Sequence, residues 1–184
     1  MGEITAEQLA NYRVDKTGWP DGPWMTEPDR TQWQHAGFAC MTVRHPRHGY
    51  WCSYVGVDRA HPCYGKHPLH DGKELFAGIE ADLNYGDHCD GVICHVPDPG
   101  MPDDVWWLGM DFGHALDYAP GMAAREAEME TRLPAMREIG ERVRRLEHEV
   151  PSLRPLYRDL AYVKAETESL AEQLRKIAEG GGKP

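Results

Sequence analysis

The sequence predicts an α+β fold: a mainly antiparallel β-sheet domain followed by a C-terminal helical hairpin or coiled coil. Short aromatic and β-branched runs, joined by turns and by no long helix, fill residues 37–121, which is typical of antiparallel sheets. Residues 122–184 are rich in Ala, Glu, Arg and Leu, and their apolar residues recur with heptad spacing. Residues 1–36 are predicted to form an irregular N-terminal arm.

The arm is expected to hold a short helix near residues 6–12 and then irregular turns, because Pro and Gly recur after it. Residues 38–43 and 50–57 predict the two strands of a hairpin, since both runs are aromatic and β-branched and a five-residue loop joins them. Three further strands are expected at residues 78–85, 92–96 and 105–111.

The apolar residues of the tail are spaced alternately three and four apart, the pattern of a coiled-coil seam. They are Met136, Ile139, Val143, Leu146, Val150 and Leu153, then Leu156, Leu160, Val163, Leu170, Leu174 and Ile177, with the polar Thr167 at one position of the second series. Pro134 and Pro155 suit the first turns of two helices, and Pro151 interrupts a continuous rod. Two interpretations stay open: a hairpin folded on itself or on the sheet, and a coil that assembles a homo-oligomer through residues 134–179.

Composition limits the location and the partners. The start of the chain has no basic and apolar signal segment, and no stretch approaches the roughly 20 apolar residues of a membrane span. We therefore expect a cytoplasmic protein with no membrane partner. Five cysteines make an odd count, which favours reduced thiols over a disulfide framework.

The net charge of −10 argues against duplex nucleic acid as a partner. Residues 123–184 hold 12 Lys/Arg and 12 Asp/Glu, so the whole negative excess lies in residues 1–122 and would repel a phosphate backbone. A small anion could still enter a local basic pocket, because local geometry can override the global sign. The candidate residues for such a pocket are Arg44, Arg47, Arg59 and Lys66.

Two loops carry the candidate chemistry. Residues 61–66 place imidazole, phenol and ammonium groups close together, which could bind an anion; the alternative is a tight turn with a surface lysine. Residues 111–117 end a predicted strand with carboxylate, imidazole and carboxylate, which could bind a metal or form a general base; the alternative is turn capping. The predicted ligand-binding residues are His61, Tyr64, Lys66, Trp107, Asp111, His114 and Asp117.

A divalent metal is the one cofactor that these residues suggest, with His61, Asp111 and His114 as its ligands. Cys89 and Cys94, followed by His95, are the pair of thiols with the most metal-like spacing. A zinc site needs a second ligand pair of similar spacing, and the other cysteines stand alone. Buried, structural thiols are therefore the favoured interpretation of the cysteines.

Several segments resemble a family of uncharacterised phage and prophage proteins. The shared features are residues 27–29, 49–57, 93–97 and 157–163, the motif HPxYGK at residues 61–66 and the motif DDVWWxGxDxxHxxD at residues 103–117. The resemblance implies a phage origin and no particular reaction. Family members tend to read His-Gly-Gly-Leu-Thr-Tyr where this chain has residues 78–85, so a three-histidine metal site with His61 and His114 would lose a ligand unless Glu80 or Asp82 replaces it.

The leading hypothesis is a non-enzymatic phage or prophage accessory protein in the host cytoplasm. It would bind a small anionic or nucleotide ligand, or a host protein, through the loops at residues 61–66 and 111–117. A counter-defence role follows from the resemblance alone. Two alternatives are a metal-dependent hydrolase that uses His61, Asp111, His114 and Asp117 with a bound water as nucleophile, and an interaction protein that works through its coil.

Overall fold

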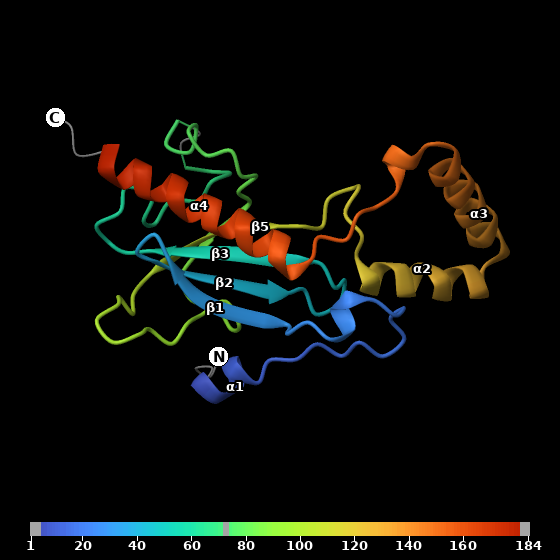
Figure 1. Cartoon of the computed structure of the whole chain (residues 1–184), viewed down its shortest axis with the longest axis horizontal. Coiled ribbons are helices and arrows are strands. Elements are labelled where there is room, and N and C mark those ends of the chain that lie inside the picture. The colour runs from blue at the N-terminus through green and yellow to red at the C-terminus, as the bar shows by residue number, and fades with distance from the viewer. Residues whose placement is uncertain (1–4, 72–73, 181–184) are drawn as a thin grey trace.

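A five-stranded antiparallel sheet with one long helix across it forms the body of the protein (Figure 1). The computed structural model describes residues 5–71 and 74–180. The strand order is β1-β2-β3-β5-β4, and all four neighbouring pairs are antiparallel. Helix α4 covers one face of the sheet, and α2 and α3 project beyond one end of it. The predicted α+β class, an antiparallel sheet followed by C-terminal helices, is confirmed.

The elements have the following bounds. The strands are β1 Arg30–His35, β2 Phe38–Arg44, β3 Trp51–Val57, β4 Tyr85–Asp87 and β5 Trp106–Asp111. The α-helices are α1 Ala6–Ala10, α2 Pro120–Arg132, α3 Pro134–Glu149 and α4 Leu160–Gly180. Two short 3-10 turns complete them, η1 Pro23–Met25 and η2 Pro151–Leu153. Within the described residues no helix is both long and apolar enough to cross a bilayer.

The hairpin of β2 and β3 and the strand β5 agree with the sequence prediction, whereas β1 was not expected. Ala36 and Gly37 have φ angles of +51° and +88°, so they form the two-residue turn that joins β1 to β2. Alanine is unusual in that conformation. Because the strand itself is polar and its turn is atypical, neither gives a clear sequence signal.

The prediction of a strand at residues 92–96 was wrong: this segment is irregular, and side chains of β1 hold it in place. The guanidinium of Arg30 donates hydrogen bonds to the carbonyls of Val92 and Cys94, and the amide of Gln32 donates to the carbonyl of Val96 at 2.9 Å. Of the strand expected at residues 78–85, only Tyr85 belongs to β4.

The two faces of the sheet have separate hydrophobic cores because successive side chains of a strand point to opposite faces. On one face, Cys40, Val55, Val57 and Leu108 pack with Leu170 and Leu174 of α4. On the other, Met41, Val43, Tyr54 and Trp107 pack together. The second heptad series of the tail is therefore used inside the monomer. Its polar member Thr167 is buried, and its hydroxyl donates to the carbonyl of Val163 at 2.6 Å.

A fully buried arginine joins the N-terminal arm to the sheet. Nε of Arg44 donates to Asp29 Oδ1 at 2.8 Å, and Nη2 donates to Glu27 Oε2 at 2.7 Å. Nη1 donates to the carbonyl of Gly49 and to the hydroxyl of Tyr157. The guanidinium carbon lies 4.0 Å from the ring centre of Trp51. The basic pocket suggested around Arg44 is therefore not available to an anion, since carboxylates and carbonyls already surround the guanidinium.

The cysteines differ from the expectation of five reduced thiols. Cys89 and Cys94 form a disulfide with a Cα–Cα distance of 4.6 Å. Paired backbone hydrogen bonds between Asp90 and Ile93 bend the chain and bring the two cysteines within disulfide range. Cys40 and Cys63 are free and buried, and burial raises the pKa of Cys40 to about 12. Those two thiols behave as apolar core residues.

Replacing Arg44 with methionine should lower the free energy of unfolding by about 3–5 kcal/mol, because Glu27 loses its cation and the buried Asp29 keeps only Lys16 as a charged partner. Urea denaturation followed by tryptophan fluorescence measures the change. The matched control is Arg59→Met, which removes an exposed pair with Asp104 and should leave the midpoint almost unchanged. An equal loss of unfolding free energy in the two variants would show that the buried network stabilises the fold no more than an exposed ion pair does.

Candidate functional site

The structure separates the two loops that the sequence suggested as one site. Strands β3 and β5 are antiparallel, with Cys52 opposite Asp111 and Val57 opposite Trp106. Residues 61–66 follow the end of β3, and residues 111–117 follow the end of β5, so they lie at opposite ends of the sheet. At about 3.4 Å per residue, the length of β3 alone separates them by roughly 17 Å.

The residues of the first loop mostly have structural partners. His61 is 6% exposed; its Nε2 lies 2.9 Å from the carbonyl oxygen of Leu174, and its Nδ1 accepts a hydrogen bond from the backbone of Cys63. Both ring nitrogens are therefore occupied. The hydroxyl of Tyr64 donates to Asp104 at 2.9 Å, while Lys66 is exposed at the surface.

Trp107 is a core residue of the opposite sheet face. Its side chain is fully buried, and the ring of His95 packs edge-on against it with 5.2 Å between ring centres. It therefore contributes to packing and does not line either loop. Cys89, Cys94 and His95, whose spacing in the sequence resembles that of metal ligands, do not form a metal site. Both thiols are in the disulfide, and His95 Nε2 lies 3.1 Å from the carbonyl oxygen of Pro102.

The second loop brings His114 and Asp117 together. His114 Nδ1 lies 3.3 Å from Asp117 Oδ2, which also accepts the backbone N–H of His114. The other oxygen of Asp117 accepts from Arg158 Nε at 2.7 Å. Asp111 instead accepts from the backbone of Gly113 and from the amide of Asn84. Asp117 therefore caps the turn and orients the half-exposed His114 ring.

The predicted metal set of His61, Asp111 and His114 is not assembled. His61 lies at the far end of the sheet with both nitrogens engaged, and Asp111 accepts from neighbours of its own turn and from Asn84. Across residues 5–71 and 74–180, no three His, Cys, Asp or Glu side chains are grouped so that they could hold a metal ion. The described residues therefore do not fit a divalent metal, and no chemistry is assigned to one.

His114 and Asp117 form one wall of an open pocket of about 680 Å³. The pocket lies between residues 113–119, α2 and α3, a region in which the sequence predicted no ligand residues other than these two. The apolar lining that α2 and α3 contribute is Met122, Ala123, Met129, Met136, Ile139 and Val143. Its further charged lining is Glu126, Glu130, Arg144, Glu147 and Arg154.

Backbone contacts at both ends fix the frame of this pocket. Helix α2 starts at Pro120, and the N–H of Gly121 donates to the carbonyl of His48 in the β2–β3 turn. Tyr118 donates to the carbonyl of Leu156, and Leu156 donates to the carbonyl of Leu116. Residues 119–155 therefore leave the body and return to it at the same place.

A paired ion contact holds α3 to α2. Both terminal nitrogens of Arg144 bind the carboxylate of Glu130, at 2.8 and 3.0 Å. Gly140 lies directly beneath this pair, and a Cβ there would overlap the Glu130 carboxylate. The heptad spacing of the tail was the sequence signal for the apolar lining on α3, but it did not show that α2 would form the opposite wall.

Comparisons with family models, curated proteins and solved structures found no match for the chain.

Acidification should destabilise the protein partly through His61. Burial lowers the pKa of this ring below its ordinary 6.5, so the unfolded chain binds a proton that the folded protein does not. Stability is therefore present above pH 6.5 and is lost as the pH falls below it towards the folded pKa. Between pH 7.5 and pH 5.5, the urea midpoint of His61→Gln should fall less than the midpoint of the wild type. The control is His70→Gln, on an exposed loop, whose urea midpoint should fall with pH as that of the wild type does. If the midpoint of His61→Gln falls equally steeply, His61 does not contribute to the acid sensitivity.

Proposed function

We propose that this chain is a non-enzymatic binding protein whose ligand occupies the pocket between residues 113–119, α2 and α3. The resemblance to phage and prophage proteins supports an accessory role of that origin. The observation that carries the proposal is the pocket itself, because its volume of about 680 Å³ lies within the usual range for ligand sites and its lining combines apolar side chains with a few polar groups.

The charges of the pocket favour a partner with apolar and basic groups. Asp117 and Glu130 are neutralised by Arg158 and Arg144. Among the ion pairs of the described residues, none involves Glu126, Glu147 or Arg154, so two carboxylates and one guanidinium of the lining are unpaired and the balance is negative. A nucleotide or another polyanion would be placed beside these carboxylates and repelled.

A host polypeptide segment with apolar and basic side chains fits this lining better than a small anion. Three of the lining residues are methionines, whose flexible side chains adapt to different apolar partners. A counter-defence role, which the resemblance suggests, would then work by binding a host protein and not by sequestering a nucleotide signal. The hydrolase alternative has no support of this kind, since its proposed residues lie at both ends of the sheet.

Filling the pocket with a larger side chain should weaken binding. Ala123 lines the pocket, whereas Ala127, one helical turn later, is exposed and does not. Fluorescence anisotropy with labelled peptides of Leu and Lys, and with matched peptides of Leu and Glu, measures the affinity. We expect the basic peptide to bind the wild type at least about 10-fold more tightly, and Ala123→Trp to weaken that binding by about 10-fold or more.

The Ala127→Trp variant is the control for general attraction of a cationic peptide to this acidic chain, and it should bind as the wild type does. Equal affinity of the Ala123→Trp and Ala127→Trp variants would show that the peptide binds elsewhere. Stronger binding of the acidic peptide would contradict the charge argument.

A further inference from the structure

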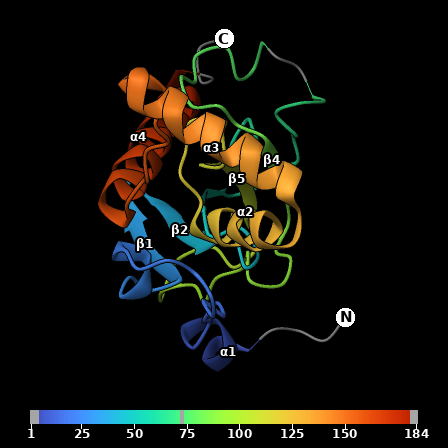
Figure 2. The same ribbon diagram turned by 90° about the vertical axis from the view of Figure 1, so that its right-hand side faces the viewer.

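Helix α3 is amphipathic and its apolar side is uncovered. Within Pro134–Glu149 no residue is buried, and the exposed fractions of Ile139, Val143 and Leu146 are 51%, 47% and 49%. Val150, just after the helix, continues the row at 38%. We call these four residues the α3 row. Figure 2 shows α3 at the end of the molecule that faces the viewer. A contiguous apolar row of this kind marks an interaction surface.

A shallow hollow borders the row and shares three of its residues, Ile139, Val143 and Leu146. On the side of the row away from the α2 pocket, a depression of about 410 Å³ is lined by α3 alone: Ile139, Arg142, Val143, Arg145, Leu146 and Glu149. The apolar side chains of the row and the spaces between them therefore lie on one continuous surface. Two such helices can place side chains of one between side chains of the other, as helices do when they pack. A surface that complements itself in this way suits a twofold dimer.

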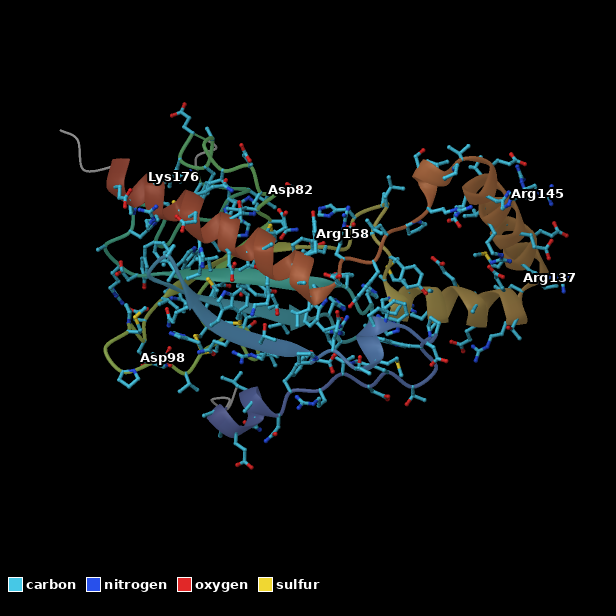
Figure 3. All side chains as sticks on the ribbon, in the orientation of Figure 1. Asp82, Asp98, Arg137, Arg145, Arg158 and Lys176 are labelled. Atoms are coloured by element: carbon cyan, nitrogen blue, oxygen red, sulfur yellow. A yellow bond between two sulfur atoms is a disulfide. The ribbon has the colours of Figure 1, made fainter. Side chains whose placement is uncertain are left out.

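The charges also favour a second copy of this chain. Residues 134–149 contain four Arg and four Glu, so two α3 helices do not repel one another. The excess of ten negative charges in residues 1–122 opposes contacts between the two bodies. Figure 3 shows Arg137 and Arg145 on the outer side of α3, directed away from the sheet. At 3.6 residues per turn these two arginines lie on the face of α3 opposite the row, so a contact made through the row leaves them exposed.

The free flank of the row sets the direction of pairing. On the other flank, Gly140 lies against the Glu130 carboxylate and Glu147 lines the α2 pocket, so α2 restricts access there. The free flank carries Arg142 and Glu149, seven residues apart in one heptad position. In an antiparallel pair, Arg142 of each copy lies beside Glu149 of the other, and charges at such flanking positions determine orientation in coiled coils.

We propose that two copies of the protein form an antiparallel dimer through the α3 row, with Arg142 of one copy paired with Glu149 of the other. A helix of 16 residues is about 24 Å long. Contact along that length buries on the order of 1,000 Å², the lower bound for a specific interface. The dimer is independent of the proposed function, although Ile139 and Val143 border both the pocket and the hollow.

Sedimentation velocity of the full chain tests the dimer over concentrations from about 1 to 100 μM, the weak end of specific association. The wild type should sediment as a dimer at the highest concentrations of this range. Leu146→Glu should be monomeric throughout, because it buries a carboxylate in the interface. The matched control is Leu69→Glu, on a distant loop and 58% exposed, which should remain dimeric. A monomeric wild type, or a Leu146→Glu variant that still dimerises, would overturn the proposal.

A charge swap tests the direction of pairing. Arg142→Glu and Glu149→Arg should each weaken the dimer by about 10-fold, since each places like charges together at two symmetric positions. The double variant should recover to within about 3-fold of the wild type. Failure of the double variant to recover would overturn the antiparallel pairing.

The pocket can be assessed in the same samples. Leu146 lines the outer hollow and not the α2 pocket, so Leu146→Glu should still bind the basic peptide. Ala123→Trp should lose the peptide and remain dimeric. Failure of either proposal is thereby distinguished from failure of the other.

Discussion

The buried guanidinium of Arg44 is the interaction on which the rest of the structure depends. Placing a charge in the interior costs several kcal/mol, and two carboxylates and an aromatic face offset that cost here. The other oxygen of Glu27 accepts the N–H of Leu160, the first residue of α4, at 3.1 Å. Residues 27–29, the end of β2 and the start of α4, which are distant in the sequence, therefore meet at one point. The arm is thus part of the fold, although its sequence gives few signals of regular structure.

Fixing the start of α4 has consequences for the segment before it. The chain leaves the body at Tyr118 and returns at Leu156, and backbone hydrogen bonds join these two points. With both ends held there, residues 119–155 extend outward as α2 and α3 while α4 lies on the sheet. The proposed pocket and the α3 row both result from this arrangement, since α3 packs mainly against α2 and the return segment.

Residue type and spacing predicted the strands and helices better than they predicted the site. Strands β2 and β5 carry the apolar runs of the core, so the pattern of their side chains predicted both strands. His61 and Trp107 were assigned to ligand binding because imidazole and indole groups often serve that purpose, yet both are packed inside the body. Their burial follows from contacts with α4 and with the loop before β5, which lie far away in the sequence. His114 and Asp117 were correctly expected to be close because only a turn separates them; the pocket beside them needs α2 and α3, whose pairing no local pattern reveals.

The two heptad series look alike in the sequence but pack differently, and their neighbouring residues explain why. On α4 the row includes Thr167, and Ala171 lies beside it; both residues are small and fully buried, which allows the helix to approach the sheet closely. On α3, charged residues stand on both sides of the row, including Arg142 on one side and Arg144 on the other. Laying α3 flat on a sheet would bury those charges at high cost. A helical partner contacts a narrower strip and leaves them at a hydrated rim, where they can form ion pairs. The composition of α3 therefore suits it to pairing with another helix and not to covering a sheet.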